Sequence, residues 1–225
     1  MDVVFTINEN GLLENAEFDD TAGLEIEDDF EEIADYLHKT TVFIPRSVVR
    51  IGDRAFYDKR WLTNVTIPGS VVSIGNDAFT DCNYLTSVML PDTITAIGTR
   101  AFAWCESLVG ISIPGKLHCL EERAFYACSS LESVLIADGV SAIGDSAFAY
   151  CGSLKGVMLP NSVKSIGNSA FSECTTLKNV TIINEAVVIA RDAFSGSSED
   201  LTFFAPESSS AEKYAAENSF RFEKI

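Results

Sequence analysis

The sequence lacks several patterns that identify common classes of protein. No apolar run approaches the roughly 20 residues that a membrane-spanning helix needs, so no membrane span is expected. No stripe of basic residues is present to neutralise phosphates, which argues against a nucleic-acid partner. The opening stretch MDVVFTINEN has neither a basic segment nor a long apolar one, so we expect no signal peptide. Either the protein is cytoplasmic or a leader was removed.

Motifs that carry chemistry are also missing. The sequence has no Cys-x-x-Cys, no Gly-x-Ser-x-Gly, no P-loop and no dinucleotide-binding fingerprint. Its two histidines, His38 and His118, stand in different regions, and the acid-rich run LEIEDDFEE lacks the Asp-x-Asp-x-Asp-Gly loop of calcium sites. A Ser-His or Cys-His pair assembled only by the fold stays open. We expect no catalytic residues, no metal and no cofactor, and hence no enzyme.

The acidic charge of the chain is unevenly placed. The formal net charge is −17, and residues 1–40 hold 13 acidic residues against one base. The other 185 residues hold 20 acidic and 15 basic residues, which is close to balance. The acidity therefore belongs mostly to the N-terminal segment.

One pattern returns along the chain every 23 residues. Its outline is Ile-Gly, two residues, Ala-Phe, two residues and Cys. The Phe of this pattern stands at Phe56, Phe79, Phe102, Phe125, Phe148, Phe171 and Phe194. The same period is kept by Cys82, Cys105, Cys128, Cys151 and Cys174, and by Leu62, Leu85, Leu108, Leu131, Leu154 and Leu177. A fixed period of this length indicates a repeat protein.

Each repeat contains two stretches that favour extended chain. In Leu-x-x-Val-x-Ile, Val65 and Ile67 alternate inward, which indicates a short strand. Pro68 ends this strand because it lacks an amide donor. Val-x-x-Ile predicts a second extended stretch on the far side of the coil. Gly-x-x-Ala-Phe-x-x-Cys then turns the chain, with a helical turn as one option.

A single coil cannot bury its own apolar side, so the coils must stack. We predict a right-handed, β-rich solenoid of 23-residue units with parallel strands on one face, stacked at about 4.8 Å per coil. Each repeated apolar residue then becomes one rung of a ladder of identical side chains. The Phe ladder is expected to lie in the core.

The cysteines and glycines of the repeat have structural interpretations. Stacked cysteines point the same way, which suits a disulfide badly, so we predict buried free thiols. Cys119 lies outside that row and is the most accessible thiol expected. The glycine of Ile-Gly is replaced by Glu121 in one repeat and by Ala190 in another. We therefore expect it to relieve crowding rather than to supply a positive φ.

The full unit, IPxSVxxIGxxAFxxCxxL, resembles the BspA-like leucine-rich-repeat family over about residues 41–206. The strand segment Leu-x-x-Val-x-Ile is also the strand signature of leucine-rich repeats. This resemblance implies a surface or secreted protein with an adhesion-type role. The last repeat departs from the pattern, with Ser197 in place of Cys and a shift of one residue at Leu201, as terminal repeats often do.

Three regions are expected along the chain. Residues 1–40 form an acidic N-terminal cap, with a hairpin turned at Asn10-Gly11 and a helix over about 28–38. Residues 41–206 hold the seven to eight repeats. Residues 207–225 form a C-terminal helical cap that opens with a capping box at Ser209 and Glu212, is closed by Asn218, and is followed by a last strand at FRF. The caps cover the open ends of the stack.

The outward position of the repeat strand is the first candidate for a binding surface. It is occupied by Thr66, Met89, Ser112, Leu135, Met158 and Thr181, beside the row Asn64, Ser87, Gly110, Ser133, Gly156 and Asn179. These residues predict a low, apolar, nearly uncharged strip of the kind that often marks a contact surface. Strand propensity alone is the plainer explanation. The second candidate is the aromatic set Tyr57, Trp104, Tyr126 and Tyr150, which half-buried packing explains better than an interface does.

Two functions from different classes are compatible with these observations. The first is a non-catalytic binding module that holds an unidentified protein or glycan on the repeat sheet, in an interaction or adhesion role. The alternative is a structural spacer or stalk in a larger surface protein, with no ligand of its own. The family resemblance favours the cell surface or secretion, and nothing in the sequence requires more than a monomer.

Overall fold

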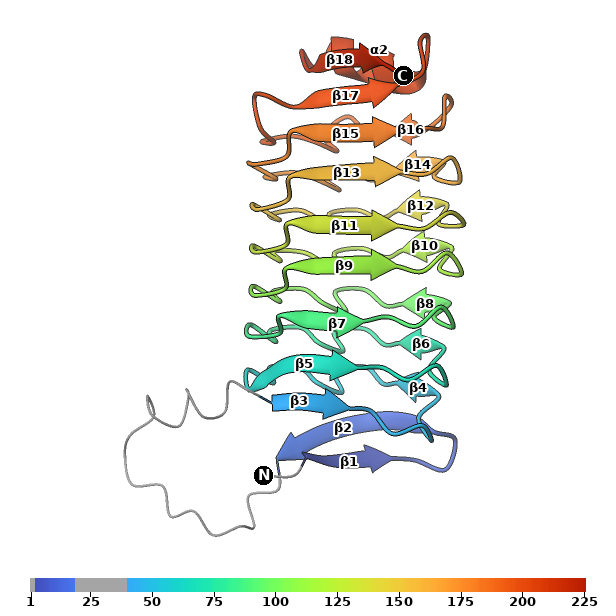
Figure 1. Ribbon diagram of the computed structural model, residues 1–225, viewed down its shortest axis with the longest axis vertical. Helices are drawn as coiled ribbons and strands as arrows, with labels where there is room; N and C mark the ends of the chain where they lie inside the picture. Colours follow the sequence, from blue (N-terminus) through green and yellow to red (C-terminus); the bar gives the residue numbers. More distant parts are fainter. Residues whose placement is uncertain (1–2, 19–39) are drawn as a thin grey trace, which may run out of the picture.

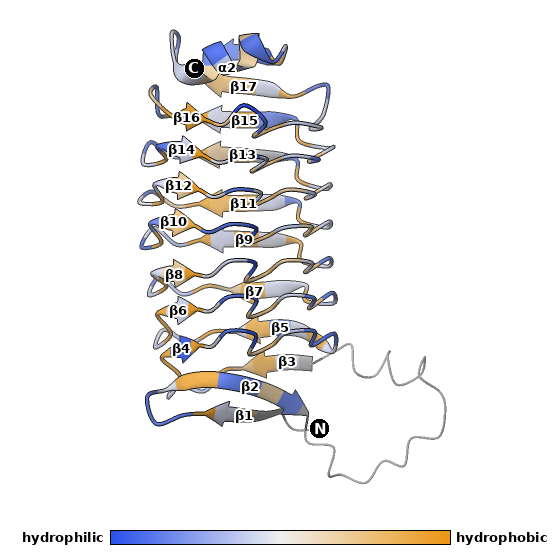
Figure 2. Ribbon diagram, turned by 180° about the vertical axis from the view of Figure 1, so that it is seen from behind, coloured by the Kyte–Doolittle hydropathy of each residue, from blue (hydrophilic) through white to orange (hydrophobic). Residues whose placement is uncertain are grey.

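Each 23-residue repeat folds into one coil of a solenoid, as the sequence predicts (Figure 1). The computed structural model describes residues 3–18 and 40–225. The repeats place a strand of three to five residues, which we call the wide strand, on one side of the stack and a two-residue short strand on the other. Parallel pairing joins equivalent strands of neighbouring coils at every level but one. Figure 2 shows the same stack from behind, with the short strands beside the wide ones.

The strands follow one another in a fixed alternation. The wide strands are β3 (Thr40–Phe43), β5 (Leu62–Thr66), β7 (Ser87–Met89), β9 (Gly110–Ile113), β11 (Ser133–Ile136), β13 (Gly156–Leu159), β15 (Asn179–Ile182) and β17 (Thr202–Ala205). The short strands are β4 (Arg50–Ile51), β6 (Ser73–Ile74), β8 (Ala96–Ile97), β10 (Cys119–Leu120), β12 (Ala142–Ile143), β14 (Ser165–Ile166) and β16 (Val188–Ile189). In β9, Ile111 and Ile113 are buried while Ser112 is exposed, because successive side chains of a strand point to opposite faces.

The phenylalanine ladder forms the centre of the core. Each Phe from Phe56 to Phe194 is fully buried, which confirms the inward assignment. Neighbouring rings stack in parallel, for example Phe102 on Phe125 with centroids 5.2 Å apart and an interplanar angle of 1°. Because burial of one Phe side chain contributes about 1.5–3 kcal/mol, the ladder is a main source of the stability of the stack.

The segment Gly-x-x-Ala-Phe-x-x-Cys is a series of tight turns and not a helical turn. In one coil, Tyr57 N–H donates to Arg54 O at 3.0 Å, and both Arg54 (φ 60°) and Asp58 (φ 56°) have left-handed backbone. The equivalent left-handed pairs are Asp77 and Asp81, Arg100 and Trp104, Arg123 and Ala127, Ser146 and Tyr150, and Ser169 and Glu173. None of these residues is glycine, and only Asp58, Asp77 and Asp81 are of a type that adopts this conformation readily. The stacked fold imposes it on the others.

The turn side is bonded continuously from coil to coil. Phe56 N–H donates to Ala78 O at 2.7 Å, and the same bond recurs as far as Phe171 N–H to Ala193 O at 2.7 Å. The left-handed residues also donate their amides to the next coil, as Asp58 N–H does to Thr80 O at 2.9 Å. These bonds pair backbone N–H and C=O groups of the turns.

The buried cysteines connect successive coils. Each ladder thiol, from Cys82 to Cys174, contacts the carbonyl oxygen of the Phe 26 residues earlier; the S–H of Cys128 donates to Phe102 O at 3.2 Å. Ser197 occupies the cysteine position of the last repeat and donates to Phe171 O at 2.9 Å. From Cys82 to Ser197 this position therefore holds a small donor, which cysteine or serine supplies, whereas the first repeat has Lys59 there.

The strand sheets are interrupted at one level. One wide sheet contains β3, β5 and β7 and a second begins at β9, and the short strands divide in the same way between β8 and β10. Figure 1 shows a wider step between β7 and β9 than between β5 and β7. Gly98 N–H donates to Ile74 O at 2.9 Å, but Glu121 makes no equivalent bond to Ile97.

Close stacking favours glycine at the Ile-Gly position of most coils. A Cβ on Gly98 would lie 2.6 Å from Asn76 Oδ1 and 2.7 Å from Asn76 N, and its φ is not positive. The expectation that the glycine relieves crowding is thus confirmed. Ala190 keeps its bond to Ile166 O at 2.9 Å, so a methyl group is tolerated there. The interruption accompanies the longer side chain of Glu121.

The N-terminal end of the described stack is covered by a hairpin. Strands β1 (Val3–Ile7) and β2 (Leu12–Phe18) pair antiparallel, and Gly11 at the turn has φ 70°. Strand β2 then pairs in parallel with β4, so the hairpin extends the short-strand sheet. The helix expected over about 28–38 lies outside the described residues.

The C-terminal end is covered by a helix and a strand. Helix α2 (Ser210–Glu217) begins at the N-cap Ser209, whose hydroxyl oxygen accepts from Glu212 N–H at 3.3 Å, and ends at Asn218. Tyr214 packs from the helix against Phe194, at the end of the ladder. Strand β18 (Arg221–Lys224) pairs in parallel with β17, so the last strand that the sequence predicts is present.

Candidate binding surfaces

The outward position of the wide strands forms a row along the solenoid, which we call the sheet strip. It contains Thr66, Met89, Ser112, Leu135, Met158 and Thr181, and strand pairing places Leu135 opposite Met158 and Met158 opposite Thr181. The exposed fractions of Met89, Leu135 and Met158 are 73%, 66% and 60%, so these apolar side chains are not covered by sheet curvature. Thr181 is half-buried. Met89 lies on the far side of the sheet interruption from Leu135.

Two phenylalanines that the sequence reasoning missed extend the sheet strip. Phe43 pairs with Thr66 and is 69% exposed, and Phe204 pairs with Thr181 and is half-buried. The signal was available, because Phe43 stands 23 residues before Thr66 and Phe204 stands 23 residues after Thr181. The two phenylalanines were overlooked because they belong to the first and last coils, where the repeat motif is incomplete.

The surroundings of the sheet strip are low and polar. The neighbouring row consists of Asn64, Ser87, Gly110, Ser133, Gly156 and Asn179. A Cβ added at Gly110 would meet Ser133 Oγ at 3.0 Å and Ser133 O at 3.6 Å. At the edge, Lys155 Nζ and Glu132 Oε2 form an exposed ion pair at 2.5 Å. An apolar row with a charged rim is the usual anatomy of a contact surface.

The structure divides the aromatic set into two groups. Trp104, Tyr126 and Tyr150 form one chain of edge-to-face contacts, with ring centroids 5.1 Å and 5.3 Å apart. Tyr57 stands apart, with the guanidinium of Arg54 4.3 Å from its ring centroid. Trp104, Tyr126 and Tyr57 are half-buried and Tyr150 is exposed, so packing accounts for part of this set, as the sequence interpretation held.

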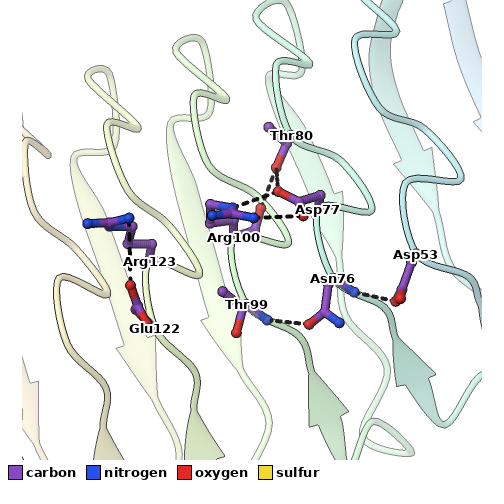
Figure 3. Close-up of polar contacts among 8 residues, drawn as sticks. All are labelled: Asp53, Asn76, Asp77, Thr80, Thr99, Arg100, Glu122 and Arg123. Atoms are coloured by element: carbon purple, nitrogen blue, oxygen red, sulfur yellow. Dashed lines mark hydrogen bonds and ion pairs between the residues drawn. The ribbon is translucent and has the colours of Figure 1, made fainter.

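Figure 3 shows charged and polar residues of the same turn side. Arg100 holds Asp77 with two bonds, Nε to Oδ1 at 2.8 Å and a terminal guanidinium nitrogen to Oδ2 at 3.2 Å. This hydrogen-bonded pair raises the pKa of Arg100 above its ordinary value. In the same view, Arg123 lies 3.6 Å from Glu122. Side chains at the Asp53 position cap the next coil, since Asn76 N–H donates to Asp53 Oδ1 at 2.7 Å.

The remaining candidates have structural roles. The five ladder thiols are buried, and desolvation raises the pKa of Cys82, Cys128 and Cys174 to about 12, so they are poor nucleophiles. Cys119 is half-buried and His118 is exposed, as expected, while His38 and the run LEIEDDFEE lie outside the described residues. In residues 3–18 and 40–225, no group of His, Cys, Asp or Glu is placed to hold a metal ion, and no helix could cross a membrane.

The coil geometry and the stacked ladders define a leucine-rich-repeat solenoid. The family model of the BspA type leucine rich repeat region matches residues 30–155 and 141–225, with six copies. The chain therefore belongs to the BspA-type leucine-rich-repeat family. Members of this class are typically non-catalytic, and the family suggests a protein-interaction or surface module.

Solved structures show the same fold. A leucine-rich repeat protein from Eubacterium ventriosum is similar with 25% identity and a TM-score of 0.65, over 71% of this chain and 43% of that one. The leucine-rich repeat protein of T. pallidum is 24% identical with a TM-score of 0.51, over 99% of this chain and 94% of that one. This chain thus spans less than half of the E. ventriosum protein. No curated protein matches the chain.

Proposed function

We propose that the chain is a non-catalytic binding module that holds a protein or a glycan against the sheet strip, in an adhesion role at the cell surface or after secretion. The observation that carries the proposal is the exposure of Met89, Leu135 and Met158 on one row of a regular sheet. Thr66 and Ser112 show that the same position accepts hydroxyl side chains. The fold therefore does not require the apolar residues.

The energetics favour a contact. Burial of apolar surface against a partner contributes roughly 25 cal/mol per Å², before the costs of association are subtracted. The same side chains contribute nothing while they remain in water. The charged pair of Lys155 and Glu132 beside the strip would orient a partner at the rim rather than add much affinity.

A structural spacer is the second candidate function. It is supported by the elongated stack and by the similarity to part of a longer protein, since the match covers 43% of the E. ventriosum chain. A spacer would keep its length and stability but would not depend on the identity of the sheet-strip residues. The two functions therefore differ in their response to changes on this strip.

The test is a variant with Met89→Asp, Leu135→Asp and Met158→Asp. Binding is measured against arrays of immobilised proteins and glycans, and folding is checked by circular dichroism and urea unfolding. The matched control is Val49→Asp, Val72→Asp and Val188→Asp, which introduces the same charge at exposed apolar residues on the short-strand side. We expect the first variant to fold and lose the partners that the control keeps. Partners kept by both variants would refute the proposal, and an unfolded first variant would show that the row belongs to the core.

A further inference from the structure

A groove crosses the turn side of the solenoid, away from the sheet strip. It spans four successive coils, from Tyr57 to Arg123, and has a volume of about 440 Å³. This volume lies in the range of about 300–1,000 Å³ that is typical of sites for small ligands. The groove is lined by two aromatic residues, Tyr57 and Trp104, and otherwise by arginine, aspartate and threonine.

Tyr57 and Trp104 line the groove from the two coils that flank one intervening coil. Tyr57 and Trp104 belong to coils two steps apart, which is about 10 Å at 4.8 Å per coil. The coil between them has the shorter Thr80 and Asp81 at these positions, and Thr80 is almost fully buried. A carbon atom touches an aromatic ring at about 3.5–4.0 Å, so the space between the two residues accommodates a single ring of a ligand.

The charged residues of the groove are only partly neutralised. Asp77 occupies Arg100, but Arg54 forms no ion pair with any residue that the structure describes. Arg123 lies 3.6 Å from the exposed carboxylate of Glu122, and its guanidinium lies over the ring of Tyr126 at 5.7 Å from the centroid, a contact that leaves its charge without a close carboxylate. The carboxylate of Asp81 accepts no hydrogen bond from the described part of the chain. The groove therefore offers two guanidinium groups to an anion and one carboxylate to hydroxyl groups.

The backbone conformation of four residues that line the groove indicates a role beyond packing. Arg54, Arg100, Trp104 and Arg123 all occupy left-handed positions, with φ between 55° and 60°. Asn, Asp and Gly adopt this conformation most readily. Other coils fill the same positions with Ala127, Ser146 and Ser169. The fold itself needs neither arginine nor tryptophan there, and unfavourable backbone positions often coincide with ligand sites.

We propose that this groove binds an oligosaccharide that contains uronic acids. A sugar ring packs its C–H groups between Tyr57 and Trp104, its hydroxyl groups donate to Asp81, and its carboxylate pairs with Arg54. Arg123 lies three coils from Arg54, about 14 Å away, so it pairs with the carboxylate of a second sugar unit. This site is separate from the sheet strip, and its occupation does not depend on the function proposed for that strip.

The proposal is tested on an array of oligogalacturonate, alginate and hyaluronan fragments, beside neutral oligosaccharides of equal length and sulfated heparin fragments. Affinities are then measured by titration with tryptophan fluorescence, since Trp104 lies in the groove. We expect the uronic-acid fragments to bind at least about tenfold more tightly than their neutral counterparts, as the loss of an anchoring charge implies. No preference over the neutral oligosaccharides would overturn the proposal. So would binding confined to sulfated fragments such as heparin.

Variants taken from the repeats themselves locate the site. Arg54→Ser, Trp104→Ala and Arg123→Ser each place in the groove a residue type that another coil carries at the same left-handed position. Each is expected to weaken binding about tenfold. The affinity of Trp104→Ala is measured by calorimetry, because this variant lacks the tryptophan of the groove. The control Tyr150→Ala changes the Trp104 position two coils beyond the groove wall and is expected to leave binding unchanged. Equal losses in all four, or loss in the folded sheet-strip variant, would contradict the assignment.

Discussion

The turn side and the strand side of the solenoid are bonded from coil to coil in different ways. On the turn side the backbone bonds pass every level, including Phe102 N–H to Ala124 O at 2.8 Å where the strands separate. On the strand side, both the wide and the short sheets stop at that level. One backbone bond remains beside the wide strands there, from Val109 N–H to Thr86 O at 3.3 Å. The difference shows that the core ladder and the turns keep the coils in order, while the strand ladders tolerate one interruption.

The two sides also differ in the chemistry that they expose. The sheet strip combines apolar and hydroxyl side chains and carries no charge between Phe43 and Phe204, whereas the turn side gathers arginine, aspartate and aromatic residues. Because the turn side is held together by backbone and core, its outward side chains can vary without loss of the fold. The four predictions below test this division of roles.

Alkaline pH is expected to have the largest effect, because it acts on every ladder thiol of the turn side. Burial raises the pKa of Cys82, Cys128 and Cys174 from 9.0 to about 12. The folded chain then holds protons that the unfolded chain releases, so this contribution to stability is complete below pH 9 and is lost as the pH rises towards 12. For each of these thiols, the free energy of unfolding falls by about 1.4 kcal/mol per pH unit in that window.

Urea unfolding at a series of pH values checks this prediction. The midpoint should fall steeply above about pH 9, the ordinary thiol pKa. A variant with serine at all five ladder positions should lose much of that dependence. If its pH profile matched that of the unmodified chain, the thiols would not be responsible.

Removal of one ring from the ladder is expected to have the next largest effect. Phe125 stacks between Phe102 and Phe148, at centroid distances of 5.2 Å and 5.5 Å. Phe125→Ala should lower the free energy of unfolding by roughly 3–5 kcal/mol, because it removes a buried aromatic and leaves a cavity. Phe43→Ala on the exposed sheet strip is the control and should change it by less than about 1 kcal/mol. If denaturant unfolding showed similar losses of free energy for Phe125→Ala and Phe43→Ala, the two sides would not differ in their contribution to stability.

The cysteine donor is expected to have a smaller effect. Cys128→Ala removes the bond to Phe102 O and should cost about 1 kcal/mol. Cys128→Ser should cost less, because Ser197 makes the same bond in the last coil. Thermal unfolding of the two variants side by side measures the difference. A serine variant less stable than the alanine variant would show that the cost of burying a hydroxyl group exceeds the gain from its hydrogen bond.

Repair of the interrupted level is expected to have the smallest effect. Glu121→Gly allows the coil to approach its predecessor and form the missing bond to Ile97 O, which gains about 1 kcal/mol, partly offset by the backbone entropy of glycine. Hydrogen exchange of the backbone N–H of residue 121 should slow most in Glu121→Gly and to a smaller extent in Glu121→Ala. Unchanged exchange in the glycine variant would mean that Glu121 does not hold the coils apart.

Much of the fold is readable from the 23-residue period. Phe125, Cys128 and Leu131 recur at fixed positions, and only stacked coils bury identical side chains at each repeat. Alternation in Leu-x-x-Val-x-Ile likewise predicts that Met89 and Leu135 point outward, and the structure places both there. The same reasoning reached the C-terminal cap, because capping by Ser209 and Glu212 is a local interaction.

The candidate sites were less accessible to sequence reasoning. The four aromatic residues were grouped by their distance from the Ala-Phe turn, but the structure separates Tyr57 from Trp104, Tyr126 and Tyr150. The arginines of the groove were not considered, because their side-chain directions depend on the left-handed backbone. A residue such as Arg54 gives no local sign of this conformation.

The sequence by itself determined the period, the inward residues and therefore the solenoid, because burial of apolar side chains follows directly from their spacing. Tertiary structure alone decided which coils stand apart and which outward side chains meet. The sheets stop at the coil of Glu121, and the position of this break along the stack is seen only in the structure. Tyr57, Arg100 and Arg123 share one groove only because left-handed turns, bonded across coils, aim them to the same side.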